Sequence, residues 1–219
     1  MIEIQKLEKH FSVAGERVDI FKDADFNLWD GDFIAIVWPS WSGKSTFLNI
    51  LSWIDREYTW SVTIDKNNIS KLSDASMTRF RGQNISYIFQ NFKLIENLTV
   101  KENIDLIVDL NKLERNFSTK EILTIVGLEN KINSYVYNLS WGESQRVAIA
   151  RAFVWKTKLL LADEPTWALD IVNKKIVMEL IVRLQKQIWN TIVLITHDDE
   201  VAELAEKIYR VHDWKLELT

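Results

Sequence analysis

The chain lacks cysteine altogether and contains only two prolines and six glycines among its 219 residues. Without cysteine it has neither disulfides nor thiol catalysis, and this composition suits a reducing compartment. No apolar run approaches the roughly 18 residues that span a bilayer, and the charged segment 1–10 does not resemble a signal peptide. A net charge of −4 argues against a broad nucleic-acid-binding surface. Any connection to a membrane is therefore expected to run through a partner.

Tryptophan is abundant where glycine is scarce. The chain has ten tryptophans, and its glycines and tryptophans together make up the share, about 7%, that glycine alone has in average proteins. Trp60, Trp189 and Trp214 stand at turn positions, where small and flexible residues are typical. Core tryptophans would instead follow the periodicity of a strand or helix.

The order of apolar segments predicts an α/β fold in a single domain over residues 1–219. Short alternating segments at about 1–32 and 55–70 indicate an antiparallel β layer. Strands that alternate with helices indicate a mostly parallel, buried sheet, formed by about 33–54, 85–94 and 155–219. Residues about 95–154 have a mostly helical pattern and are expected to form a helical subdomain. Ligands of such sheets bind at the C-terminal ends of the strands.

Capping signals and periodicity locate the individual elements. Ser118 and Glu121 have the spacing of a capping box, and Gly127 suits the position after a helix C-terminus. Periodicity and length predict the remaining elements. These are strands at Ile85–Gln90, Leu159–Ala162 and Ile192–Ile195 and helices at Val100–Leu110, Glu143–Val154 and Val172–Gln187.

The strand Phe33–Val37 is followed by a loop and a helix, which is the context of a G-x-x-x-x-G-K-[ST] phosphate-binding loop. In such a loop Lys44 would reach the β- and γ-phosphates and Ser45 would hold Mg²⁺. Of the expected glycines only Gly43 is present, so the segment taken alone is also compatible with a surface turn. The candidate nucleotide-binding residues are Trp38, Pro39, Ser40, Trp41, Ser42, Gly43, Lys44, Ser45 and Thr46.

A second polar site follows the apolar strand Leu159–Ala162, which ends in Asp163 and Glu164. Successive side chains of a strand point to opposite sides, so one carboxylate can face a metal ion while the next faces a water molecule. Asp163 is the candidate Mg²⁺ ligand and Glu164 the candidate general base. In isolation a solvated acidic pair would be the simpler interpretation, but the phosphate-loop pattern favours the catalytic one.

Several further segments give the chain a resemblance to the ATPases of the ABC family, from residue 2 to about 216. Leu139–Arg146 resembles the L-S-G-G-E/Q signature motif, and Asp163–Asp170 resembles a Walker B segment that runs into a D-loop. His197 matches the switch histidine and Gln90 the Q-loop glutamine. Phe11 has the position of the aromatic residue that stacks on adenine.

The resemblance implies an enzyme that hydrolyses ATP with Mg²⁺ and works as a dimer. Gln90 would join Ser45 and Asp163 at the metal ion. His197 would contact the γ-phosphate and hold the attacking water near Glu164. The signature motif of one subunit would contact ATP bound to the other in a head-to-tail dimer, with a helix N-terminus as its anion site. The residues assigned to that contact are Ser140, Trp141, Gly142, Glu143 and Asp170.

The sequence resembles most the subgroup that serves lipoprotein release and macrolide export. Phe89–Leu94, Leu98–Asn103 and Leu161–Asp170 carry this likeness, although a subgroup devoted to cell-division signalling shares much of it. A transmembrane permease subunit is then the expected partner, docked near Gln90 and the helical subdomain. The protein would lie in the cytoplasm, peripheral on the inner face of the cell membrane. No coiled-coil insertion, second cassette or basic patch supports a soluble ABC protein of DNA repair or translation.

Two interpretations of the tryptophans are open. If those in the phosphate loop and the signature motif are real, each forced positive φ costs about 1–3 kcal/mol. The protein would then be a degenerate, non-hydrolysing module with a structural or regulatory role. Such a module should also have lost its catalytic polar residues, and all of them are present. We therefore favour the hypothesis that UGA codons for glycine have been translated as Trp38, Trp41, Trp60, Trp141, Trp167, Trp189 and Trp214.

The coding DNA tests this hypothesis. We expect TGA at codons 38, 41 and 141, and TGG at these positions would refute the idea. An independent measurement compares the ATP turnover of two purified versions, one with tryptophan and one with glycine at these positions. Equal rates would show that the steric argument against tryptophan is wrong.

Overall fold

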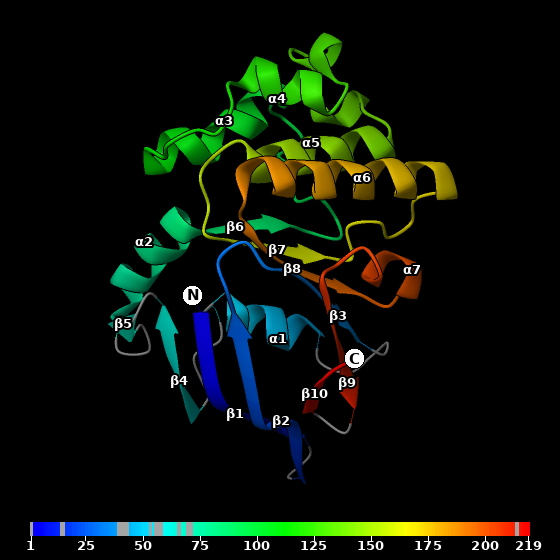
Figure 1. Ribbon diagram of the computed structural model, residues 1–219. Helices are drawn as coiled ribbons and strands as arrows, with labels where there is room; N and C mark the ends of the chain where they lie inside the picture. Colours follow the sequence, from blue (N-terminus) through cyan, green and yellow to red (C-terminus); the bar gives the residue numbers. More distant parts are fainter. Residues whose placement is uncertain are drawn as a thin grey trace. The chain divides into compact units, whose positions relative to one another are not determined.

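The computed structural model describes residues 2–13, 16–38, 44–52, 54, 59–64, 67–68, 72–212 and 215–219. The chain forms two compact units, one made of Met1–Arg81 with Thr191–Thr219 and the other of Gly82–Asn190. Figure 1 gives the elements of both units. Among the described residues, no helix combines the length and apolar character that a membrane span requires.

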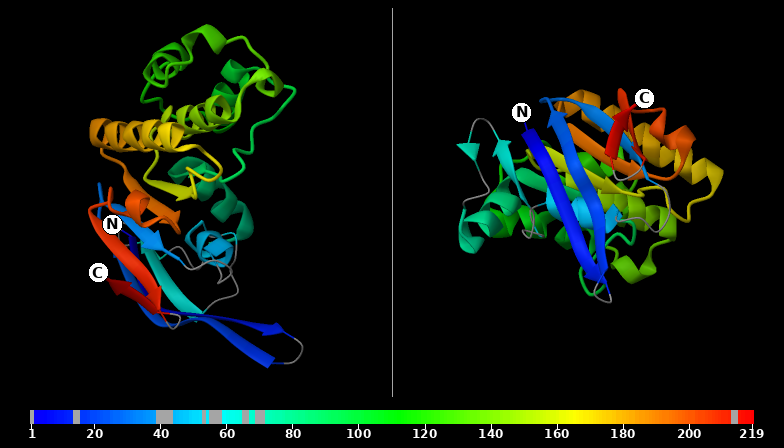
Figure 2. Two further views of the ribbon diagram at one scale, coloured as in Figure 1. Left: turned by 90° about the vertical axis from the view of Figure 1, so that its right-hand side faces the viewer. Right: turned by 90° about the horizontal axis from the view of Figure 1, so that it is seen from below.

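The first unit contains the expected antiparallel layer. Its strands are β1 (Ile2–Val13), β2 (Glu16–Leu28), β4 (Thr59–Ile64) and β5 (Asn67–Asn68), in the order β2-β1-β4-β5. β1 and β2 form a long hairpin, which Figure 2 shows as two adjacent strands. Pairing shifts interrupt the hairpin register at three places. The prediction of an antiparallel N-terminal layer is confirmed.

The first unit also contains three parallel strands, of which β3 and β8 are largely buried. β3 (Phe33–Val37) pairs in parallel with β8 (Thr191–Thr196) and with β9 (Lys207–His212). β10 (Lys215–Leu218) then pairs antiparallel with β9. All of β8 and the first four residues of β3 are buried, as their uninterrupted apolar sequence predicts. β3 and β8 were predicted, whereas β9 and β10 were not, because their residues are more polar.

Aromatic side chains pack helix α1 (Lys44–Leu51) and strands β2 and β9 of the first unit against one another. Phe47 lies in α1, with its ring centroid 6.0 Å from that of Phe26 in β2 and 5.4 Å from that of Trp38. Phe26 also makes an edge contact with Tyr209 of β9, at 5.1 Å. Because Phe26 belongs to the antiparallel layer, these contacts fix that layer against the helix and the parallel strands. A short helix, α7 (Asp199–Ala202), follows β8.

The second unit combines two parallel strands with helices. β6 (Ile85–Ile88) pairs in parallel with β7 (Leu159–Asp163). α5 (Trp141–Phe153) packs against β6 and against the other helices of this unit, and Figure 1 shows α5 and α6 running side by side. Those helices are α3 (Val100–Asn111), α4 (Thr119–Ile125) and α6 (Ile171–Ile188). The unit also contains the 3₁₀ turns η1 (Glu129–Lys131) and η2 (Val136–Asn138).

Two α-helices were not predicted, α2 (Asp74–Asn84) and the four-residue α7. α2 runs across the boundary between the two units. Met77 is its only buried residue, so the segment has no apolar stripe of helical period from which the helix could be recognised. Its N-terminal turn carries Asp74 and its C-terminal turn Arg81, which both favour a helix through its dipole.

Capping boxes begin three helices of the second unit. Ser118 accepts a hydrogen bond from the Glu121 backbone N–H, and the Glu121 carboxylate accepts one from Ser118 N–H at 2.7 Å. The box that was predicted for α4 is thus confirmed, and α3 and α5 begin in the same way. Gly127, just past the end of α4, has φ 70°, as expected for a residue that follows a helix C-terminus.

Trp189 ends α6 in a conformation that favours glycine. Its φ is 54° and its ψ 42°, in the left-handed region, and its N–H donates to Gln185 O at 2.7 Å. The indole is 67% exposed, so little packing offsets the backbone strain. A glycine would satisfy the same cap without the Cβ contact that makes this region unfavourable for other residues.

We therefore expect Trp189→Gly to raise the free energy of unfolding, by up to about 1 kcal/mol. Trp167→Gly is the matched control, because Trp167 is also exposed but its φ is negative. Urea unfolding of the three proteins gives the comparison. An equal or lower stability of Trp189→Gly would show that its indole contributes more than its backbone angle costs.

Candidate functional site

The two candidate catalytic carboxylates lie at the end of buried strand β7. The strand is buried over Leu159–Ala162, and Asp163 is its first partly exposed residue. Glu164 follows with only 3% of its surface exposed and with φ 44°. A left-handed conformation in a glutamate is uncommon, and strain of this kind concentrates at functional sites. The turn beyond it is closed by a hydrogen bond from Trp167 N–H to Glu164 O at 3.0 Å.

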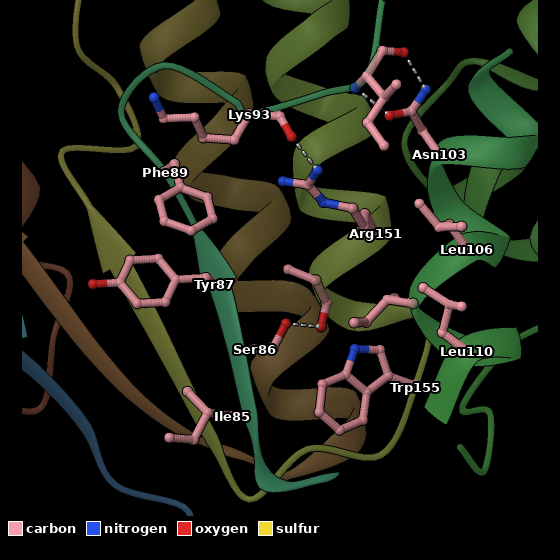
Figure 3. Close-up of a pocket in the computed structure, with 13 residues that line it drawn as sticks. Ile85, Ser86, Tyr87, Phe89, Lys93, Asn103, Leu106, Leu110, Arg151 and Trp155 are labelled. Atoms are coloured by element: carbon pink, nitrogen blue, oxygen red, sulfur yellow. Dashed lines mark hydrogen bonds between the residues drawn. The ribbon is translucent and has the colours of Figure 1, made fainter. Parts of the chain in front are cut away.

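Tyr87 of β6 adds a neutral hydroxyl next to this acidic strand end. Burial, and then the negative charge of Asp163, raise the pKa of the Tyr87 phenol far above its ordinary value. Tyr87 therefore keeps its proton at neutral pH. In Figure 3 its hydroxyl points away from the helices of this unit. Tyr87 is not among the site residues predicted from the sequence.

The predicted signature motif forms the N-terminus of α5. Ser140 is the N-cap and its hydroxyl accepts a hydrogen bond from Glu143 N–H at 3.3 Å, while the Glu143 carboxylate accepts one from Ser140 N–H at 2.8 Å. The bond from the Ser140 backbone is the largest of the effects that lower the pKa of Glu143, and Lys131 contributes through an ion pair at 3.3 Å. Trp141, the first residue of the helix, is 47% exposed.

Gly142 allows α5 to approach α6 closely. A Cβ built on Gly142 would lie 3.0 Å from Asn173 Oδ1, which is tighter than most real Cβ contacts. Asn173 is held in place by Asp170, the N-cap of α6, whose carboxylate accepts from Asn173 N–H at 2.9 Å and from Asn173 Nδ2 at 2.6 Å. These bonds lower the pKa of Asp170. Asn173 thus lies beside Gly142 and is hydrogen-bonded to Asp170, which brings these two residues of the predicted nucleotide contact close together.

Gln145 connects the same helix to the turn that follows the carboxylates. Its side chain is buried, and its Nε2 donates to Pro165 O at 2.5 Å. Pro165 directly follows Glu164, so this bond ties the backbone after Glu164 to α5. Gln145 lies in the predicted signature segment, but its role in positioning this turn could not be read from the sequence, because the contact spans 20 residues.

Gln90 lies just after β6, at the start of an irregular segment. It is half-buried, and Phe92 and Lys93 that follow it both have φ 50°. Arg151 of α5 holds this conformation, since its guanidinium donates to Phe92 O at 2.6 Å and to Lys93 O at 2.7 Å. The ring of Phe92 packs edge-on against Trp141, with centroids 4.5 Å apart. The segment after Gln90 and the signature helix are therefore in direct contact.

The first unit holds the remaining candidates. The β3 and β8 strands end side by side, and Trp38 N–H donates to Thr196 O at 3.1 Å across this edge. His197 is exposed immediately after β8, and Lys44 is the first residue of α1. Parallel strands that end together in this way are typical of ligand sites in α/β proteins.

Several predicted residues are only partly covered by the structure. Trp38 is fully buried against Phe47, so its indole is a core side chain. Phe11 lies in β1 opposite Val18, but its side chain is outside the described part of the chain. Ser45 and Thr46 lie in α1, again without described side chains. The other phosphate-loop residues lie outside the described residues: Pro39, Ser40, Trp41, Ser42 and Gly43.

Comparison with known proteins decides the family. The sequence profile of the family described as ABC transporter matches residues 21–167. The chain belongs to the ABC transporter family. It is an α/β cassette of the ATP-binding, ATP-hydrolysing type, as its sequence predicted, and the comparisons do not support the alternative of a degenerate module.

Individual relatives match the cassette over its whole length. An uncharacterized ABC transporter ATP-binding protein of Bacillus subtilis, YvrO, is 36% identical over 100% of this chain and 96% of its own length. The macrolide export ATP-binding/permease protein MacB of Marinobacter nauticus is 34% identical over 99% of this chain, which covers 34% of MacB. The dimeric structure of MJ0796, a cassette of Methanocaldococcus jannaschii, matches with a TM-score of 0.86 and 34% identity over 99% of this chain and 97% of that one.

Proposed function

We propose that this cassette hydrolyses ATP to power transport through a separate membrane permease of the export or lipoprotein-release type. The observation that carries the proposal is the end of β7, where a buried glutamate in a left-handed conformation follows a half-buried aspartate. The similarity to MacB, whose name joins an ATP-binding part to a permease, supports the transport role. The protein would then act in the cytoplasm, on the inner face of the membrane.

Lys44 and the N-terminus of α1 would bind the phosphates of ATP, together with the loop before them. Ser45, Gln90 and Asp163 would hold Mg²⁺. The hydroxyl, amide and carboxylate oxygens of these three residues are the hard ligands that this ion prefers. When bound, the ion would neutralise charge that develops on the transferred phosphoryl group. Phe11 would stack on the adenine.

Glu164 would act as the general base that positions and deprotonates the attacking water. Its burial excludes bulk solvent from the carboxylate, and the bond from Gln145 to Pro165 O fixes the turn beyond it. His197 would contact the γ-phosphate. Catalysis in this scheme rests on positioning and on preorganised charge, without a covalent intermediate.

A second copy of a cassette would complete the site. The α5 N-terminus, at Ser140 to Glu143, offers backbone N–H groups and a partial positive charge to a γ-phosphate bound by the partner subunit. Asp170 would lie at the same contact, because it is hydrogen-bonded to Asn173, which lies beside Gly142. The dimeric structure of MJ0796 supports this assembly.

The permease would dock in a groove of the second unit, which we call the α3 groove. Its volume is about 290 Å³ and Figure 3 shows its walls. β6 and the following residues form one wall, α3 forms the other, and Trp155 lies at the base. Because the Gln90 segment forms part of the wall, a segment of the permease bound here would sense closure around ATP and transmit it. The lining residues used below are Phe89, Lys93, Leu106, Leu110, Arg151 and Trp155.

Replacing Glu164 with glutamine tests the assignment of the general base. We expect Glu164→Gln to reduce ATP turnover by about 10²–10⁴-fold, because the amide cannot accept the proton of water. ATP binding should persist and a dimer should accumulate in gel filtration with ATP. Glu203→Gln, at an exposed glutamate beyond α7, is the matched control. A Glu164→Gln protein that turns over ATP at the wild-type rate would refute the assignment.

Affinity capture tests the transport role. Tagged cassette expressed in its own host should retain one integral membrane protein, identified by mass spectrometry after detergent extraction. Leu110→Asp should reduce this retention, because Leu110 is 72% exposed and lines the α3 groove. Leu204→Asp places the same change at another exposed leucine, outside the groove. A cassette that retains no membrane protein would contradict the proposal, and equal retention by both variants would contradict the docking site.

A further inference from the structure

We infer that the permease segment in the α3 groove carries an acidic side chain, which pairs there with Arg151 and Lys93. This inference rests on the proposed function, because it takes the permease as the occupant of the groove. It adds the chemistry of recognition. The occupant must present apolar side chains and one carboxylate.

The charged side chains that line the α3 groove are all positive. Among its thirteen lining residues only Lys93 and Arg151 carry a full charge, and none is acidic. The other lining side chains are apolar, aromatic or neutral polar. A segment that brings a further cation would be repelled, and a wholly apolar one would bury these two cations without a counter-ion, which is costly.

Arg151 has capacity for a further partner. A guanidinium has five N–H donors, and Arg151 uses one bond to Phe92 O and one to Lys93 O. The described residues give it no carboxylate within ion-pair distance. Desolvation lowers the pKa of Arg151 to about 10, so its charge is poorly solvated where it stands. An arriving carboxylate would accept the free donors in the planar geometry that guanidinium and carboxylate share.

Lys93 supplies the second charge at the mouth of the groove. Its side chain is exposed, and the described residues offer it no ion-pair partner. Figure 3 shows Lys93 above Phe89, while the guanidinium of Arg151 extends between the two walls. Lys93 would therefore meet an acidic group as it approaches, and Arg151 would bind it once it is seated.

The apolar walls define the rest of the occupant. Leu106 and Leu110 are four residues apart on α3 and face the groove. Together with Phe89 and Trp155 they form a surface suited to the apolar stripe of an amphipathic helix. A short helical segment with one or two large apolar residues, and a glutamate or aspartate one turn away, fits both features.

The face of α3 that adjoins the groove, and shares Leu106 and Leu110 with it, would favour one orientation of this segment. A neighbouring hollow is lined by Glu102, Asp105 and Asp109, with Lys101 the one cation among its lining residues. Asp105 is already engaged by Lys101 at 3.1 Å and Arg115 at 2.8 Å. An acidic side chain placed on this side would meet like charge. Repulsion there and attraction at Arg151 together favour one orientation of the bound segment.

Charge reversal at Lys93 tests the inference. The probe is the permease identified by affinity capture, purified in detergent and titrated onto immobilised cassette. We expect Lys93→Glu to weaken binding at least about ten-fold, because like charges would then face each other. Lys186→Glu is the matched control, since Lys186 is an exposed lysine in the last turn of α6, outside the groove. Changing one acidic residue in a cytoplasmic loop of the permease to lysine should restore binding to Lys93→Glu alone.

Arg151→Gln provides a second variant. Because Arg151 also holds the backbone at Phe92 and Lys93, its fold is checked by thermal unfolding and its nucleotide site by ATP hydrolysis without permease. Binding of permease to Lys93→Glu with wild-type affinity would overturn the inference and leave the proposed function intact. Failure of the wild-type cassette to bind any permease would instead contradict the proposed function. Loss of binding in both Lys93→Glu and Lys186→Glu to the same extent would show a general effect of charge and also overturn the inference.

Discussion

The structure depends on the burial of three of its parallel strands, β3, β7 and β8. β8 is buried throughout and the first four residues of β3 and of β7 are buried as well. A charged side chain inside such a strand would lose its hydration without compensation, so polar chemistry can begin only where a strand ends. His197 follows β8, Asp163 ends β7, and Glu164 follows Asp163. The burial that stabilises the core therefore also confines the candidate catalytic groups to the ends of the strands.

Helix α5 organises the second unit around one of these strand ends. Ser140 caps it, Gly142 lets it approach α6, Gln145 holds the turn after Glu164, and Arg151 holds the segment after Gln90. Helix α5 therefore contains part of the signature motif, holds the turn after Glu164 and lines the α3 groove. A displacement of α5 would move all three of these sites together. This gives a physical basis for coupling between ATP hydrolysis and the proposed partner in the groove.

Periodic and capped segments could be predicted from sequence because their signals are local. The strands β3, β7 and β8 and the capping box at Ser118 are confirmed, most with bounds shifted by one or two residues. α2 was missed because only Met77 of its residues is buried. The left-handed conformation of Glu164 also has no sequence signal, because a glutamate adopts it only when surrounding packing imposes it.

The sequence by itself determined the family, the fold class and the residue types available for ATP chemistry, because these follow from motif order and from apolar periodicity. The tertiary structure alone decided which distant residues meet. It joined Asp170 to Gly142 through Asn173, tied Gln145 to Pro165, and placed Arg151 in a groove without an acidic partner among the described residues. It also made Trp38 a core residue against Phe47. Such contacts depend on packing between segments far apart in the chain, and no local pattern encodes them.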